Sequence, residues 1–294
     1  MRTWLLLLAM LGTAPALAAC PPEGQSRESL QALKVLKYTV PDAAERLALA
    51  NGLLDCLADP DPVLRDQIAY EALTQWLQAG DFDADTLRGL RDQLLAMLSG
   101  DDAEGFRRPF AALILSEVAR TDRIAPWMTP VERAAMVDEA AGFVESVRDY
   151  RGFDGKDGWR HGVAHGADWL MQLSLNPALE RAQTDRILAA VAAQAVPETA
   201  HAYVFGEPGR LARPVLYIAK RGLYSDADWQ AWFAALVPKL GGDASLAYND
   251  STWLARRHDL MGFLMSLYVE ADHSDDAHIR QLKPAIVAAL KQVP

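Results

Sequence analysis

The feature that most constrains this fold is a repeated pattern of polar helix starts, each followed by an apolar run. Charged residues or histidine mark the beginning of five such segments, at Arg65, Arg108, His161, Arg213 and Arg257. Their spacings are 43, 53, 52 and 44 residues. That period suits helical hairpins that bury their apolar faces against neighbouring hairpins. Strand-like alternation is almost absent, so the sequence predicts an all-α fold.

Turn and capping signals divide the chain into about 12 predicted helices. The segment 59–66, Asp-Pro-Asp-Pro-Val-Leu-Arg-Asp, resembles the turn and inner helix of a HEAT repeat. We therefore expect one HEAT-like array of helical hairpins over residues 20–294, with a non-repetitive helical globule as the alternative. The expected helices are 27–38, 41–58, 62–79, 84–99, 107–121, 130–149, 158–175, 179–194, 208–222, 226–240, 251–270 and 274–291.

Residues 1–19 have the pattern of a signal peptide. Arg2 gives a positive start, residues 4–11 are apolar, and Ala16-Leu17-Ala18 forms a small-residue cleavage site. The apolar run is shorter than the ~20 residues that a membrane-spanning helix needs. The sequence therefore predicts an exported protein of the periplasm or cell envelope.

Cys20, at the predicted cleavage point, has two possible roles. Leu17-Ala18-Ala19-Cys20 resembles the lipobox of bacterial lipoproteins, and lipidation of Cys20 would be the chain's one link to a membrane. The other cysteine is Cys56, and paired cysteines in an oxidising compartment form disulfides. We expect a Cys20–Cys56 disulfide, worth ~3–4 kcal/mol, with lipidation as the alternative.

Composition argues against one class of partner. The chain has 39 acidic and 29 basic residues, a formal net charge of −10. Such a chain repels phosphate backbones, so we expect no nucleic-acid binding. The sequence contains no Gly-x-Ser-x-Gly motif and no phosphate-cradling glycine loop, which leaves open whether the protein is an enzyme.

A polar stripe marks the predicted helix 158–175. His161, His165, Asp168 and Gln172 fall within about a 60° wedge at 100° per residue, and apolar side chains cover the rest. Gly162 and Gly166 would each cost ~1 kcal/mol in a helix interior. We therefore expect another backbone or a ligand to approach closely there.

Three interpretations of this stripe stay open. His161, His165 and Asp168 would bind a divalent metal such as zinc, line a groove for a metal-free ligand, or satisfy one another in a buried network. Gly162 stands where zincin peptidases have their glutamate base, so that mechanism is excluded.

Further polar residues are expected near the stripe. In an array of hairpins, the loops 150–158, 195–208 and 241–251 lie along one rim. Arg213, His258 and Asp259 are expected in the first turns of the helices that follow these loops, close to the same rim. They complete the predicted ligand-binding set, in which His258 or Asp259 would be a further metal ligand.

The segment that carries the stripe resembles a known family. Tyr150-Arg151-Gly152-Phe153-Asp154, the motif Gly-Trp-x-His-x-x-x-His-x-x-Asp from Gly158 to Asp168, and Arg257-His258-Asp259-Leu260 resemble the bacterial domain of unknown function 2785. The resemblance covers about residues 40–270. It implies a helical fold and no particular reaction.

The predicted function is that of an exported helical repeat protein. It would bind a small molecule or a protein partner in a groove centred on His161, His165 and Asp168. The alternatives are a metal-dependent hydrolase of the cell envelope and a scaffold whose histidines are purely structural.

Overall fold

The computed structural model describes residues 20–241, 245 and 249–294; the predicted signal peptide and parts of the predicted loop 241–251 lie outside the described residues. The all-α prediction with about 12 helices is confirmed. Two predicted helices, 62–79 and 274–291, each contain two of the labelled helices. The bounds are α1 Arg27–Val35, α2 Ala43–Cys56, α3 Pro62–Leu64, α4 Glu71–Ala79, α5 Ala84–Met97, α6 Arg107–Ile124, α7 Pro130–Ser146, α8 Gly162–Ser174, α9 Arg181–Ala195, α10 Glu207–Lys220, α11 Asp226–Ala234, α12 Ser251–His273, α13 Ala277–Arg280 and α14 Lys283–Leu290.

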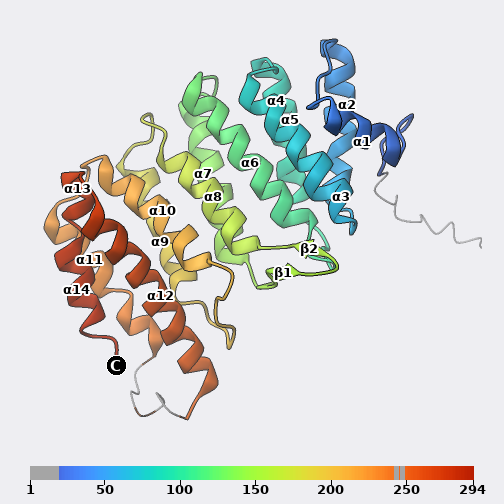
Figure 1. Ribbon diagram of the computed structural model, residues 1–294. Helices are drawn as coiled ribbons and strands as arrows, with labels where there is room; N and C mark the ends of the chain where they lie inside the picture. Colours follow the sequence, from blue (N-terminus) through green and yellow to red (C-terminus); the bar gives the residue numbers. More distant parts are fainter. Residues whose placement is uncertain (1–19, 242–244, 246–248) are drawn as a thin grey trace, which may run out of the picture.

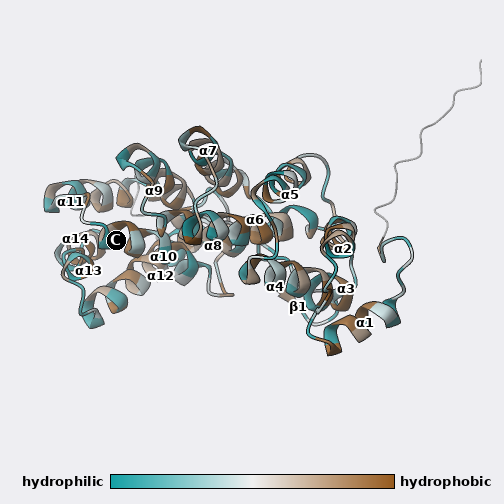
Figure 2. Cartoon of the chain, turned by 90° about the horizontal axis from the view of Figure 1, so that it is seen from above, coloured by the Kyte–Doolittle hydropathy of each residue, from teal (hydrophilic) through white to brown (hydrophobic). Residues whose placement is uncertain are grey.

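Most of the helices form two layers. Figure 1 shows α6, α8, α10 and α12 side by side, and Figure 2 shows α5, α7, α9 and α11 in a second row. Within the first row, α8 packs between α6 and α10, and α10 packs against α12. One hydrophobic core runs through the array, from Leu30 to Ala289. The helical-repeat origin of this arrangement stays a prediction.

Local sequence signals explain where many helices begin. Asp42 and Asp83 cap α2 and α5 by accepting backbone N–H bonds. Thr129 and Glu132 form a reciprocal capping box at the start of α7, where Pro130 takes the first helical position. These side chains satisfy N–H groups that lack partners within the helix.

One predicted helix start is wrong. Residues 158–161 do not belong to α8; instead a short hairpin pairs β1, Phe153–Asp154, with β2, Gly158–Trp159. Asp157 does not cap a helix, and its carbonyl accepts a 2.7 Å bond from Arg65 Nη2. Arg65 begins a π-helical segment, Arg65–Tyr70, between α3 and α4. The hairpin is thus held by a residue far away in sequence, which helical periodicity does not reveal.

A disulfide joins Cys20 to Cys56. A sulfur in a disulfide cannot also carry a lipid thioether, so this pairing favours the predicted bridge over lipidation. Among the helices that the structure describes, none has the length and hydrophobicity needed to cross a membrane.

Candidate functional site

His161 immediately precedes α8 and has an unusual backbone conformation. Its φ is +55° and its ψ is +40°, the left-handed region that residues other than glycine rarely adopt. Its N–H donates to the Arg151 carbonyl at 3.0 Å, and its carbonyl accepts the His165 N–H at 3.0 Å. His161 therefore links the β-hairpin to α8, and the prediction that it lies within the helix is wrong.

The His161 side chain is buried against a carboxylate. Only 7% of the residue is exposed, and its ring stacks on Trp159 with centroids 4.7 Å apart. Its Nε2 lies 3.5 Å from Oε1 of Glu207, the first residue of α10. Glu207 is 2% exposed, and its Oε2 accepts the Phe205 N–H at 2.9 Å. Burial alone would raise the pKa of Glu207, but His161 and the backbone N–H donors hold it below its usual value.

His165 is also buried and is neutral at pH 7. Its Nδ1 lies 3.2 Å from the Pro109 carbonyl, which only accepts, so Nδ1 carries the proton. Its ring meets the Phe110 ring edge-on at 5.2 Å. Burial, aided by the neighbouring His161, lowers the pKa of His165 to about 3. These contacts match the predicted buried network for this residue.

Asp168 faces α10 instead of the two histidines. Its Oδ2 pairs with Arg210, and its Oδ1 lies 3.9 Å from Arg213 Nη1. That Oδ1 is buried and has no hydrogen-bond partner among the described residues. Burial raises the pKa of Asp168, against the opposing effect of Arg210. Gln172, one turn further along α8, accepts a 3.3 Å bond from Arg123 of α6.

Gly166 has a close contact, but side chains make it instead of the predicted backbone or ligand. A Cβ at this position would lie 2.6 Å from Val144 Cγ2 and 3.0 Å from Phe143 Cε1, both in α7. At Gly162 the nearest side chains stand at ordinary contact distance. The side chains of α7, and not a ligand, therefore account for Gly166.

The predicted metal ligands do not form a metal-binding set. Within residues 20–241, 245 and 249–294, no three His, Cys, Asp or Glu side chains are placed to hold a metal ion. Asp168 is engaged by arginines, whereas zinc sites need at least three converging donors. The residues present do not fit the zinc hypothesis.

The two later residues of the predicted set differ from each other. His258 is exposed, whereas Asp259 is fully buried and accepts the Tyr203 N–H at 2.7 Å. Burial raises the pKa of Asp259 to about 6, and its Oδ2 lacks a hydrogen-bond partner in the described part of the chain. Tyr203 also donates its hydroxyl to Gln194 Oε1 at 2.8 Å.

Two of the three predicted rim loops do lie together. Tyr150 stacks on His201 with centroids 5.3 Å apart, and a Cβ on Gly152 would overlap the Phe205 ring. The loop before α10 is thus held from both sides, by the hairpin loop and by Asp259 of α12. We call His161, His165, Glu207 and Asp259 the buried cluster.

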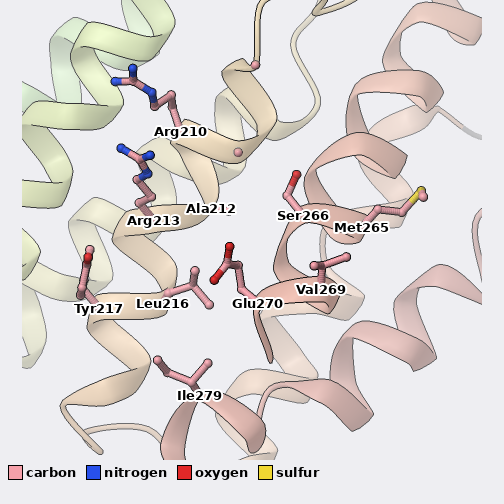
Figure 3. A pocket seen from close by; sticks show the side chains of 12 residues that line it. Arg210, Ala212, Arg213, Leu216, Tyr217, Met265, Ser266, Val269, Glu270 and Ile279 are labelled. Carbon is pink, nitrogen blue, oxygen red and sulfur yellow. The ribbon is translucent and has the colours of Figure 1, made fainter. Parts of the chain in front are cut away.

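An open cavity lies along α10. It has a volume of about 680 Å³ and is bordered by α10, α12 and α13. Figure 3 shows Arg210 and Arg213 extending from one side of α10, and Glu270 extending from α12 toward α10. We call this cavity the inner cleft; its lining comprises Gly206, Gly209, Arg210, Ala212, Arg213, Leu216, Tyr217, Met265, Ser266, Val269, Glu270 and Ile279.

The structure thus divides the predicted set between two places. His161, His165 and Asp259 belong to the buried cluster, while Arg213 lines the inner cleft and Asp168 lies beside it. The predicted ligand-binding set left out Glu207, Arg210 and Glu270, although Glu207 belongs to the predicted rim loop 195–208 and Arg210 follows it closely. Arg210 lies one turn before Arg213 on the same helix, a spacing that was visible in the sequence.

Comparisons with known proteins give a family and no activity. The model of a protein family of unknown function, DUF2785, matches residues 94–269, more than half of the chain. This range includes α8, the buried cluster and most of the inner cleft lining. No curated protein and no solved structure matches the chain. The chain therefore belongs to the DUF2785 family of proteins of unknown function.

Proposed function

We propose that this protein binds a small ligand in the inner cleft, and that the buried cluster holds the walls of the cleft in place. The observation that carries the proposal is the cleft itself. Its volume of about 680 Å³ lies within the ~300–1,000 Å³ typical of small-molecule sites, and two arginines line it. Such convergent polar groups on an apolar lining are typical of ligand recognition.

The difference in accessibility favours the inner cleft over the two histidines as the place where a ligand binds. His161 and His165 are almost fully buried and contact other protein groups, so a ligand would have to displace those contacts. Arg213 is half exposed and borders open space. The binding site predicted from the sequence therefore moves from the histidines to the arginine side of Asp168.

The cellular location belongs to the same proposal. A signal peptide at residues 1–19 and a Cys20–Cys56 disulfide both suit the periplasm or cell envelope. The ligand would then be a molecule available outside the cytoplasm.

Thermal-shift assays on a cleft-filling variant test the binding function. The probes are a panel of amino acids, short peptides, monosaccharides and carboxylic acids at millimolar concentration. Gly209 lines the cleft, and a Cβ there would meet nothing within 4 Å, so Gly209→Phe fills the cleft without a clash at its base. Gly89→Phe is the matched control, because Gly89 lies in α5 and its Cβ is equally unobstructed.

At least one probe should raise the Tm of the wild type and of Gly89→Phe, and leave that of Gly209→Phe unchanged. If no probe stabilises the wild type, or if the same probes stabilise Gly209→Phe equally, the cleft is not the binding site.

A further inference from the structure

We infer that the ligand is a small apolar zwitterion, specifically a short peptide with a free amine and a free carboxylate. This inference rests on the proposed function and adds the chemical class of the ligand. It follows from three properties of the inner cleft: a cationic group on α10, an anionic group on α12 and apolar side chains in the same lining.

Arg213 supplies the cationic group. Its side chain is 49% exposed, and among the described residues it makes no hydrogen bond, the closest carboxylate oxygen being Asp168 Oδ1 at 3.9 Å. Arg210 beside it is already paired with Asp168. A guanidinium presents parallel N–H donors that match the two oxygens of a carboxylate. Arg213 is therefore the group best placed to receive a ligand carboxylate.

Glu270 supplies the anionic group. It is exposed on α12, extends toward α10, and forms no ion pair with Arg210, Arg213 or any other described residue. A carboxylate at this position accepts hydrogen bonds from a ligand ammonium group. Because Glu270 and Arg213 lie on different helices, they would hold the two ends of one molecule in a fixed direction.

Apolar side chains make up another part of the lining. Leu216, Met265, Val269 and Ile279 all border the cleft, and Met265 and Val269 are about half exposed. A ligand that covers them gains roughly 25 cal/mol for each Å² of apolar surface removed from water. Apolar peptide side chains meet this requirement, whereas a sugar or a small polar acid does not.

The same charges disfavour a polyanion. Asp168 lies beside the two arginines, Glu270 adds a second carboxylate to the cleft, and the chain as a whole carries a net charge of −10. Phosphate-rich ligands would be repelled by this field. A ligand with one carboxylate and one amine matches the mixed charges of the cleft.

Isothermal titration calorimetry with the tripeptide Leu-Ala-Leu tests the inference. The free tripeptide, its C-terminal amide and its N-acetyl form are titrated into the wild type, Arg213→Ala and Glu270→Gln. We expect the amide and the N-acetyl form each to bind the wild type about tenfold more weakly than the free tripeptide. Arg213→Ala should not distinguish the free peptide from its amide, and Glu270→Gln should not distinguish it from its N-acetyl form.

Equal affinity of the three peptide forms for the wild type overturns the zwitterion. So does an absence of Leu-Ala-Leu binding. The thermal-shift panel separates this failure from that of the proposed function. If a probe of another class stabilises the wild type but not Gly209→Phe, the cleft is still a binding site and only the zwitterion is overturned. If no probe behaves in this way, both the zwitterion and the proposed function are overturned.

Discussion

The buried cluster and the inner cleft share α10, which contributes Glu207 to the cluster and Arg210 and Arg213 to the cleft. The two places differ in how exposed their charged side chains are and in the partners that these side chains have. In the cluster, Glu207 is enclosed and meets His161 and a backbone N–H. In the cleft, Arg213 and Glu270 are exposed and have no hydrogen-bond partners in the part of the chain described. Burying a carboxylate without donors is costly, so Glu207 meets His161 and a backbone N–H, whereas the exposed Arg213 and Glu270 can still form hydrogen bonds with a ligand.

The difference also separates the histidine-containing sequence motif from the cleft proposed as the binding site. The Gly-Trp-x-His-x-x-x-His-x-x-Asp motif places two histidines among protein groups, and only its last residue, Asp168, borders the cleft region. Its geometry suits the joining of the β-hairpin, α8 and the loop before α10. Changes in the cluster should therefore act on stability, and changes in the cleft on binding.

The largest expected effect is that of Glu207→Ala. The substitution leaves the partly buried Phe205 N–H without its acceptor and His161 without its facing carboxylate, so the free energy of unfolding should fall by about 2–4 kcal/mol. Urea unfolding followed by circular dichroism measures this loss. The matched variant Glu270→Ala, in the open cleft, should stay within ~0.5 kcal/mol of the wild type. Similar losses of unfolding free energy in the two variants would show that the buried cluster and the inner cleft do not differ in their contribution to stability.

Two glycines give a second, smaller comparison. Gly166→Ala forces a Cβ to within 2.6 Å of Val144 and should cost about 1–3 kcal/mol, because packed cores resist added volume. Gly209→Ala faces the open cleft and should stabilise α10 by up to about 1 kcal/mol, the helix preference of alanine over glycine. Thermal unfolding of both variants checks the opposite signs. A destabilised Gly209→Ala would mean that the cleft is less open than the structure shows.

The smallest predicted effect is on pH dependence. The folded pKa of Asp259, about 6, lies above the ordinary value, so the folded state binds the extra proton and stability falls as the pH rises from about 4 through 6. The Tyr203 N–H and His258 oppose this shift, while Glu207 adds to it.

Asp259→Asn keeps an acceptor for Tyr203 and cannot titrate. The difference in unfolding free energy between variant and wild type should move in favour of the variant by about 1 kcal/mol between pH 5 and pH 7.5. Denaturant unfolding at the two pH values measures the shift. A constant difference would show that Asp259 does not titrate in this range.

The sequence predicted the helices well because their signals are local. Caps such as Asp42 and Asp83, together with apolar periodicity, place most helix ends within a few residues. The start of α8 was misplaced because the β-hairpin depends on Arg65, which is far away in sequence and donates to the Asp157 carbonyl. The left-handed backbone of His161 has no signal in the residue type either, since histidine is compatible with a helix.

The candidate site was only partly predictable for the same reason. The spacing correctly placed His161 beside His165, but Asp168 faces the arginines of α10 instead of the histidines, and partners of all three come from other helices. Glu207 and Arg210 reach α8 only through the packing of α10 against it. Which side chain is enclosed and which is open to a ligand depends on that packing, which no local pattern reports.

The most direct test compares the unfolding free energies of His161→Asn and Arg213→Ala. Asparagine adopts the left-handed backbone at low cost, so His161→Asn removes the ring that stacks on Trp159 and faces Glu207 without adding backbone strain. If the residues of the buried cluster hold the fold and the cleft residues do not, His161→Asn loses about 2–3 kcal/mol and Arg213→Ala less than ~0.5 kcal/mol. An unaffected His161→Asn, or an equal loss in Arg213→Ala, would contradict that division of roles.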